Sequence, residues 1–173
     1  MLEAFGEEQR QKLFSSFTCP KNPDVETFLK SKAIRFEESD NSRTYLILDS
    51  DNGNILAYFS LSFKEVSLEN SDISKSQIKR LDGINKTSER VRAYLIGQIG
   101  KNFAITPNEI TLKIILDEIY AIIDEAKALI GGRAVILECE KNEKLLNLYQ
   151  DNGFNILINT QDEPLVTMYT YIA

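Results

Sequence analysis

The sequence contains no histidine among its 173 residues. Histidine is the commonest metal ligand, and it is the only side chain whose ordinary pKa lies near neutrality. Its absence excludes a Ser-His-Asp triad, a Cys-His pair and any metal site that needs imidazole ligands. We therefore predict no metal site.

Cysteine is scarce as well, because only Cys19 and Cys139 occur. Two thiols cannot build a four-thiolate zinc site, and a single pair is a thin basis for a disulfide framework. Free cysteine is among the residue types most often buried. We predict two reduced, buried thiols.

Long apolar runs are missing too. Residues 1–12 carry several charged side chains and lack the apolar run of a secretory signal. The most apolar stretch, residues 114–130, is interrupted by Asp117, Glu118, Asp124, Glu125 and Lys127. It is therefore unlike the run of about 20 apolar residues that crosses a bilayer. We expect a cytoplasmic protein with no membrane partner.

An excess of positive charge is also absent. The chain has 20 Lys and Arg against 26 Asp and Glu, a net charge of −6, and a pI near 4.8. A general nucleic-acid-binding surface is disfavoured, because non-specific affinity comes chiefly from cationic side chains. Two interpretations of the local basic residues stay open, a basic binding face or a solvated surface. These residues are Lys75, Lys79, Arg80, Lys86, Arg90 and Arg92.

The composition that is present, 43% hydrophobic and 27% charged, is typical of a globular protein. The length suits one domain, so we predict a single domain over residues 1–173. Periodicity and turn residues predict helices at residues 24–36, 76–81, 108–130 and 142–152, and strands at residues 44–49, 55–63, 91–99, 134–139, 154–158 and 165–172. This order indicates a mixed α/β sheet with helices on its faces.

Two features of the predicted elements bear on function. The polar excursion at residues 65–90 is typical of a surface connection that carries partner or substrate contacts. The predicted helix at 108–130 places its isoleucines on one broad face and ends at Gly131 and Gly132.

The end of the strand at residues 91–99 is a candidate ligand site. Gly97 and Gly100 indicate either close approach of a ligand or a bulge. The next segment, residues 106–111, opens the long helix, and unpaired N–H groups at a helix start can bind a pyrophosphate. The alternative is a surface helix with a simple cap at Thr106, Asn108 or Glu109.

Three segments carry a resemblance to a known family: residues 94–102 (YLIGQIGKN), 132–140 (GRAVILECE) and, most specifically, 142–154 (NEKLLNLYQDNGF). They resemble the GCN5-related N-acetyltransferase (GNAT) superfamily, with Leu148 at a position where an aromatic is usual. The resemblance implies a mixed, mostly antiparallel central sheet flanked by helices, the GNAT-like acyl-CoA N-acyltransferase fold. Residues 17–20, 25–29 and 57–61 are similar to the branch with toxin acetyltransferases that act on aminoacyl-tRNA.

The resemblance implies direct transfer of an acetyl group from acetyl-CoA, a cosubstrate, to a primary amine. In that mechanism the amide of Ile99 or Gly100 stabilises the oxyanion, and Tyr149 is the general acid that protonates the CoA thiolate. The alternative for Tyr149 is an ordinary core tyrosine. The implied cofactor-binding residues are Ile99, Gly100, Lys101, Asn108, Glu109, Ile110, Thr111 and Asn142.

The segment at residues 106–111 departs from the family pattern. The family usually has Gln/Arg-x-x-Gly-x-Gly/Ala here, whereas this segment has no glycine, Pro107 has no N–H, and Glu109 adds a carboxylate. One hypothesis is an active enzyme that holds the diphosphate with fewer amides plus Lys101, Lys113 or Thr111. The other is a catalytically degenerate binding or regulatory module.

The sequence says less about the catalytic base and the acceptor amine. Glu138 and Glu140 are candidate bases or ordinary exposed carboxylates, and we assign no catalytic base. The acceptor is a small-molecule or macromolecular amine. Aminoacyl-tRNA is compatible with the front-half resemblance and disfavoured by the net charge of −6, and a homodimer is compatible with the sequence.

Overall fold

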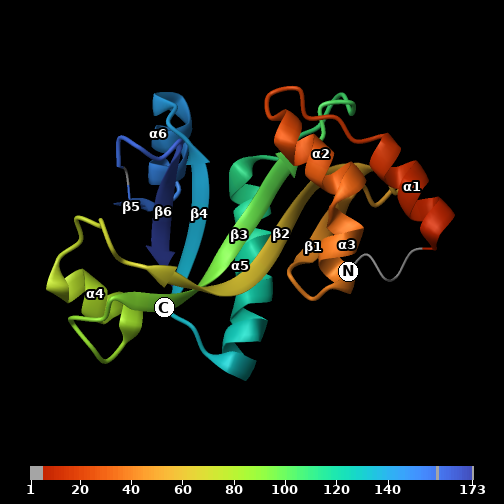
Figure 1. Cartoon of the computed structure of the whole chain (residues 1–173). Coiled ribbons are helices and arrows are strands. Elements are labelled where there is room, and N and C mark those ends of the chain that lie inside the picture. The colour runs from red at the N-terminus through yellow and green to blue at the C-terminus, as the bar shows by residue number, and fades with distance from the viewer. Residues whose placement is uncertain (1–5, 159, 173) are drawn as a thin grey trace. The chain divides into compact units, whose positions relative to one another are not determined.

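The computed structural model describes residues 6–158 and 160–172 (Figure 1). Its elements are α1(Glu7–Ser15), α2(Pro23–Ser31), α3(Ala33–Glu38), β1(Arg43–Leu48), β2(Ile55–Ser67), α4(Lys75–Asp82), β3(Arg90–Lys101), α5(Leu112–Ile130), β4(Ala134–Glu140), α6(Glu143–Asp151), β5(Asn155–Ile158) and β6(Leu165–Tyr171). The strand order is β1-β2-β3-β4-β6-β5. The β3/β4 pair is parallel, while β1/β2, β4/β6 and β5/β6 are antiparallel, so the predicted mixed, mostly antiparallel sheet is confirmed.

The chain forms two compact units. The first comprises Met1–Ser62 and Gly97–Ile122, and the second comprises Phe63–Ile96 and Ile123–Ala173. Strands β2 and β3 and helix α5 each continue from one unit into the other. Each unit has a hydrophobic cluster of its own.

The first unit packs its N-terminal helices on the hairpin of β1 and β2. Its buried cluster is made by Phe14, Phe17, Cys19, Val25, Phe28, Leu29, Ala33, Ile55 and Tyr58. Tyr58 is fully buried, donates its hydroxyl to the carbonyl of Val25, and meets the ring of Phe17 edge to face at 5.2 Å. The buried hydroxyl is therefore satisfied, and the predicted hairpin is confirmed.

The predicted helix at residues 24–36 is wrong in one respect, because the structure has two helices there. Asn22 caps α2 by accepting the amide N–H of Val25 at 3.3 Å. The chain then bends at Lys32, which has φ −120° and ψ −30°. This bend brings α3 against β1, where the buried carboxylate of Glu37 accepts the amide of Thr44 at 2.8 Å. The spacing of apolar residues does not encode that contact.

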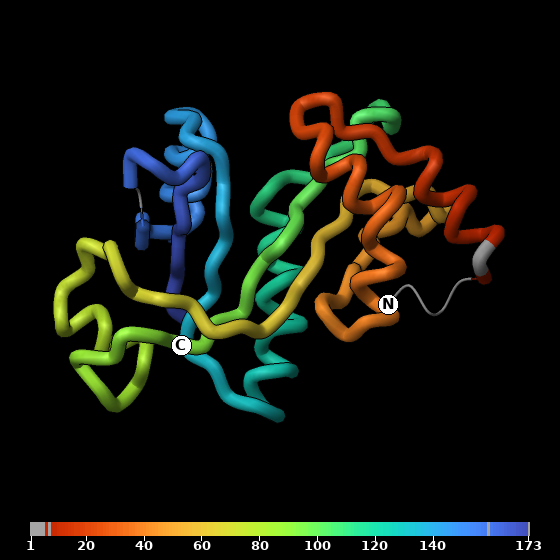
Figure 2. The backbone as a smooth tube through the Cα atoms, viewed as in Figure 1, coloured from red at the N-terminus to blue at the C-terminus, as the bar shows by residue number. Residues whose placement is uncertain are grey.

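The second unit is built on β4, β5 and β6, with Leu68, Leu81, Val91, Ala93, Ala134, Ile136, Leu157 and Tyr169 in its buried cluster. Figure 2 traces the chain out of β2, through α4 and back into β3. Helix α4 begins with a capping box between Ser74 and Gln77 and ends at Gly83, whose φ is 97°. The predicted short helix of the polar excursion is confirmed.

Helix α5 differs from its prediction at both ends. It begins at Leu112 rather than Asn108, since Thr111 caps it by accepting the amide of Ile114 at 3.3 Å. Gly131 follows its last residue with φ 74°, as predicted. However, Leu129 is 84% exposed and Ile130 is 61% exposed, so the last turn of the predicted apolar face is not buried.

Both cysteines are free and buried, as predicted. Burial raises the pKa of the Cys19 thiol and of the Cys139 thiol. Both therefore remain protonated at neutral pH and are poor nucleophiles. Within residues 6–158 and 160–172, no helix is both long and apolar enough to span a membrane.

Candidate functional site

The last residues of β3, Ile99, Gly100 and Lys101, lie in the first unit. A Cβ at Gly100 would lie 2.5 Å from Val25 Cγ1 and 2.9 Å from the ring of Phe17. The close approach anticipated at this glycine is therefore made by the protein's own core. Glycine is required there by packing.

Asn102 follows β3 and organises the chain beyond it. Its side chain is fully buried, and its Oδ1 accepts the amides of Thr18 and Ala104, each at 3.0 Å. Its Nδ2 donates to the carbonyl of Ile55 at 2.8 Å. One side chain thus joins the end of β3 to the segment after α1 and to the start of β2.

Asn108 holds the other end of the same loop. Its Nδ2 donates to the carbonyls of Leu56 and Asn102, each at 2.9 Å, and its Oδ1 accepts the amide of Ile110 at 3.1 Å. The ammonium of Lys101 donates to the carbonyl of Asn108 at 2.7 Å. These bonds fasten residues 102–110 to β2, which explains why α5 starts four residues later than the helical pattern indicates.

The predicted diphosphate-binding groups are therefore largely engaged within the loop. Lys101 and Ile110 both bond to Asn108, and the hydroxyl of Thr111 caps α5. Glu109 is exposed. At the start of α5, Ile114 and Ile115 donate their amides to the hydroxyl and the carbonyl of Thr111. Within residues 6–158 and 160–172, the amides of Leu112 and Lys113 have no such acceptor, and they lie at the positive end of the helix dipole.

The backbone amide of Leu112 is a candidate diphosphate-binding group that was not predicted from the sequence. The signal was present, because a threonine directly before an apolar run is a helix start. The run that begins at Leu112 follows Thr111 directly. The prediction placed the helix start at Asn108 because Ile110 has helical spacing with the later isoleucines.

The segment around α6 in the second unit has the predicted form. The Oδ1 of Asn142 accepts the amides of Lys144 and Leu145 at 3.0 and 3.3 Å, so it caps α6. The helix ends before Gly153, whose φ is 88°, and Phe154 is buried. The predicted helix and its C-terminal stop are confirmed, while a role of Asn142 toward a cofactor stays a prediction.

Tyr149 lies on α6 and is half-buried. Its ring meets the ring of Phe154 edge to face at 5.8 Å, and its carbonyl accepts the amide of Phe154 at 3.1 Å. Burial, and secondarily the neighbouring Cys139, raise the pKa of Tyr149 to about 12. The hydroxyl is therefore protonated at neutral pH and can act as a hydrogen-bond donor.

Glu138 and Glu140 are exposed, and Cys139 between them is buried, as the alternation of side chains along β4 requires. Glu138 lines a hollow of about 350 Å³ in the second unit together with Glu69 and Glu163. This matches the alternative in which both glutamates are ordinary exposed carboxylates.

The predicted site residues fall into two groups. Seven of the proposed cofactor residues lie in the first unit, namely Ile99, Gly100, Lys101, Asn108, Glu109, Ile110 and Thr111. Asn142 and Tyr149 lie in the second unit.

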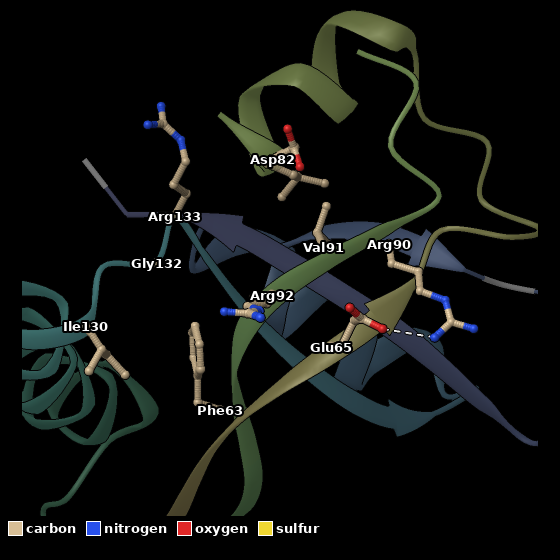
Figure 3. A pocket seen from close by; sticks show the side chains of 10 residues that line it. Phe63, Glu65, Asp82, Arg90, Val91, Arg92, Ile130, Gly132 and Arg133 are labelled. Carbon is tan, nitrogen blue, oxygen red and sulfur yellow. Dashed lines mark hydrogen bonds and ion pairs between the residues drawn. The ribbon is translucent and has the colours of Figure 1, made fainter. Parts of the chain in front are cut away.

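The basic residues noted in the sequence gather only in part. Arg90 and Arg92 line a pocket of about 400 Å³ in the second unit, where Arg133 joins them (Figure 3). The guanidinium of Arg80 lies 3.9 Å from the ring centroid of Tyr171. Lys75, Lys79 and Lys86 are exposed and do not line that pocket.

No protein-family model matches the chain, and no curated protein matches it. Solved structures do match. A Tyr-to-Phe mutant of KacT has 19% identity over 89% of this chain and 85% of its own, with a TM-score of 0.70. AtaT complexed with acetyl-methionyl-tRNAfMet has 16% identity over 89% of this chain and 85% of its own, with a TM-score of 0.67.

A third solved structure is a Tyr-to-Phe mutant of the AtaT toxin bound to acetyl-CoA and to the C-terminus of the antitoxin AtaR. It has 13% identity over 94% of this chain and 84% of its own, with a TM-score of 0.65. Likeness at this level of identity concerns the fold. The chain therefore has the GNAT-like fold of these toxins.

Proposed function

We propose that the chain is an acetyl-CoA-dependent N-acetyltransferase. The observation that carries the proposal is Tyr149, a protonated, half-buried tyrosine on the Asn142-capped helix α6, in a fold shared with a toxin solved with acetyl-CoA. Two of the three solved structures described above are Tyr-to-Phe mutants, which is consistent with a working tyrosine in proteins of this fold.

In the proposed reaction an uncharged amine attacks the thioester carbonyl, and the C–S bond breaks as the amide bond forms. The amide of Ile99 or Gly100 stabilises the oxyanion. The proton that the amine loses balances the proton that the CoA thiolate gains. The amides of Leu112 and Lys113 are the groups we assign to the diphosphate, since Lys101 and Ile110 are bonded within the loop.

The raised pKa refines the role of Tyr149. A phenol with a pKa of about 12 is roughly 3.5 pKa units weaker as an acid than a thiol of pKa ~8.5, so complete proton transfer costs about 5 kcal/mol. Hydrogen-bond donation to the sulfur, as negative charge develops there, does not need that transfer. We therefore assign Tyr149 first as the donor that stabilises the leaving thiolate.

Substitution of Tyr149 tests this assignment. Tyr149→Phe should lower the rate of acetyl transfer by about 10²-fold and leave the acetyl-CoA dissociation constant unchanged, because only the hydroxyl is removed. Isothermal titration and radiolabelled acetyl transfer measure the two quantities. Tyr171→Phe is the matched control, since burial also raises the pKa of Tyr171 to about 12. Equal rates in both variants would remove Tyr149 from the mechanism.

The pH dependence gives a second test. The transfer rate should rise with pH as the acceptor ammonium loses its proton. At any pH under ~11 the rate should not decline, because Tyr149, with a pKa raised to about 12, keeps its proton in that range. A rate that declines through pH ~10 would show that the donor has an ordinary phenol pKa.

The acceptor we would test first is the amino group of an aminoacyl-tRNA, because AtaT has been solved with acetyl-methionyl-tRNAfMet. The net charge of −6 opposes this choice. Filter binding of tRNA across a salt series decides it, since phosphate contacts make affinity fall steeply with salt. Binding that is absent or independent of salt points instead to a small amine or a protein amino group.

A non-catalytic binding module is the second candidate function. The observation that favours it is the loop itself, in which Asn108 takes up both the Lys101 ammonium and the Ile110 amide. If acetyl-CoA at millimolar concentration produces neither heat nor a thermal shift, this candidate replaces the enzyme.

A further inference from the structure

A pocket of about 400 Å³ lies in the second unit where β3 and β4 begin (Figure 3). Buried Leu81 and Val91 contribute apolar surface to its lining. Phe63, Arg92 and Ile130 gather on one side of it, and the pair of Glu65 with Arg90 lies on the other. The proposed acetyl-transfer mechanism uses none of these residues.

The walls of the pocket are held in place by packing. The ring of Phe63 lies 4.8 Å from the ring of Tyr94, whose hydroxyl donates to the carbonyl of Gly131. A Cβ at Gly132 would lie 2.4 Å from Tyr94 Cε2, so the chain passes directly over that ring. The end of α5 is thereby fastened to β3, and the pocket needs little ordering before a ligand binds.

The end of α4 forms another wall and positions Arg133. A Cβ at Gly83 would lie 2.9 Å from Arg133 Cδ, and Arg133 Nε donates to the carbonyl of Arg80 at 3.1 Å. The arginine side chain is therefore laid against the C-terminal end of α4. Its remaining guanidinium N–H groups stay available for an acceptor.

The carboxylates of the pocket are already engaged. Glu65 pairs with Arg90 at 2.9 Å, and Asp82 accepts the amides of Ile84 and Asn85 at 3.1 and 2.5 Å. Across residues 6–158 and 160–172, neither Arg92 nor Arg133 forms an ion pair. Two guanidinium groups of the pocket thus lack an internal carboxylate.

Exposed apolar side chains line the pocket beside these arginines, and two more adjoin its lining residues in the chain. Ile130 and Phe63 line the pocket and are 61% and 37% exposed. Leu129, which precedes Ile130, is 84% exposed, and Ile84, which follows Gly83, is 88% exposed. Exposed apolar residues gathered around arginine are typical of a protein-binding surface. A bare phosphate would leave these apolar side chains in water.

We propose that this pocket docks a segment of a partner protein that carries a large apolar side chain flanked by carboxylates. The apolar side chain lies against Phe63 and Ile130, and the carboxylates bind Arg92 and Arg133 in bidentate fashion. Elsewhere the net charge of −6 repels an acidic segment. The arginine pair therefore decides where such a segment binds.

The docking pocket is separate from Tyr149 and does not depend on the proposed catalytic role. Arg133 immediately precedes β4, whereas Cys139, the neighbour of Tyr149, is near the end of that strand. At ~3.3 Å per residue the two positions are about 20 Å apart. The proposal therefore stands whether or not the chain transfers acetyl groups.

The test uses the full chain and a fluorescein-labelled synthetic peptide of alternating Leu and Glu, with fluorescence anisotropy as the readout. The double charge reversal Arg92→Glu and Arg133→Glu should weaken binding by at least roughly tenfold. Lys144→Glu, an exposed cation of the same unit that does not line the pocket, is the matched control. Ile130→Ser should also weaken binding, whereas Ile114→Ser in the first unit should not.

Three further probes make the test specific: a Leu and Lys peptide, a Ser and Glu peptide, and a single-stranded RNA of similar length. Both control peptides should bind more weakly than the Leu and Glu peptide. The Leu and Lys peptide lacks the carboxylates, and the Ser and Glu peptide lacks the large apolar side chains. Binding of RNA alone, or affinity unchanged by the double reversal, would overturn the proposal. So would the absence of any binding by the Leu and Glu peptide.

A measurement on the unsubstituted chain locates the contact. In amide NMR spectra the Leu and Glu peptide should shift the signals of Gly132, which lines the pocket, and of Gly83, which packs against Arg133. The signal of Gly53, in the turn of the first unit, should stay in place. Shifts confined to other residues would place the peptide elsewhere and refute the assignment.

Discussion

The loop at residues 102–111 leads from β3 into α5, and the segment at residues 142–154 holds α6 from its cap to its stop, and both depend on asparagine. Asn142 bonds to amides two and three residues ahead. Asn102 instead accepts the amide of Thr18, 84 residues away, and Asn108 donates to the carbonyl of Leu56, 52 residues away. A cap is local and can be recognised in a sequence, whereas a long-range bond is decided by which strand lies opposite.

The same contrast distinguishes the proposed residues of the first unit from those of the second. In the second unit Tyr149 lies on a helix whose start and stop were both predicted. In the first unit the segment predicted to hold the diphosphate is a loop held by its own side chains, and the amides that we assign to the diphosphate begin at Leu112. The loop at residues 102–111, where the family pattern is weaker, is therefore also the region whose structure depends on contacts with residues distant in the chain.

The largest effect is expected at Asn102. Asn102→Ala removes three hydrogen bonds of a fully buried side chain, to the amides of Thr18 and Ala104 and to the carbonyl of Ile55, and it should lower the free energy of unfolding by about 3 kcal/mol. Urea denaturation measures this change. Asn147→Ala, an exposed asparagine of α6, is the control and should stay within about 0.5 kcal/mol of the parent. Equal effects at the two positions would break the comparison.

Asn108 should show the next largest effect. Asn108→Ala removes its bonds to Leu56 and Asn102 and frees the amide of Ile110, so a loss of about 1.5 kcal/mol is expected. Hydrogen exchange should accelerate through residues 102–111 and remain unchanged in α6. Exchange that stays slow in this loop would mean that Asn108 does not hold it.

Asn142 should show the smallest effect of the three. Asn142→Ala removes one N-cap, which costs about 1 kcal/mol. Because the cap is local, faster exchange should be confined to the first turn of α6, including Lys144 and Leu145. Asn142→Ser should restore most of the loss. A loss greater than that of Asn102→Ala would reverse the ranking on which the comparison rests.

Elements with local signals were predicted correctly. The hairpin of β1 and β2, the short helix α4 and the stop of α6 at Gly153 all depend on neighbours within a few residues. The errors have another origin. The bend at Lys32 accompanies the contact of Glu37 with Thr44, and the late start of α5 follows from the bond of Asn108 to β2. Periodicity reports burial along one element and does not report these partners.

The site shows the same division. The helix of Tyr149 could be identified because a cap, an apolar face and a terminal glycine follow one another in the chain, whereas the role of Tyr149 was implied only by the family resemblance. The pocket with Arg92 and Arg133 could not, since β3 and the turn before β4 meet only in the sheet. Gly100 was recognised as a point of close approach, but its neighbours, Val25 and Phe17, come from distant segments.

The sequence by itself determined the types of the elements that follow α1, the mixed sheet, the absence of imidazole chemistry and the free, buried thiols, whereas helix α1 was not predicted. Each of these follows from composition or from interactions among close neighbours in the chain. Only the tertiary structure decided that Asn108 would take up Lys101 and Ile110, and that exposed Ile130 would lie beside Arg92 at one pocket. Such arrangements depend on which surfaces pack together, and packing brings together residues whose order in the chain carries no record of the contact.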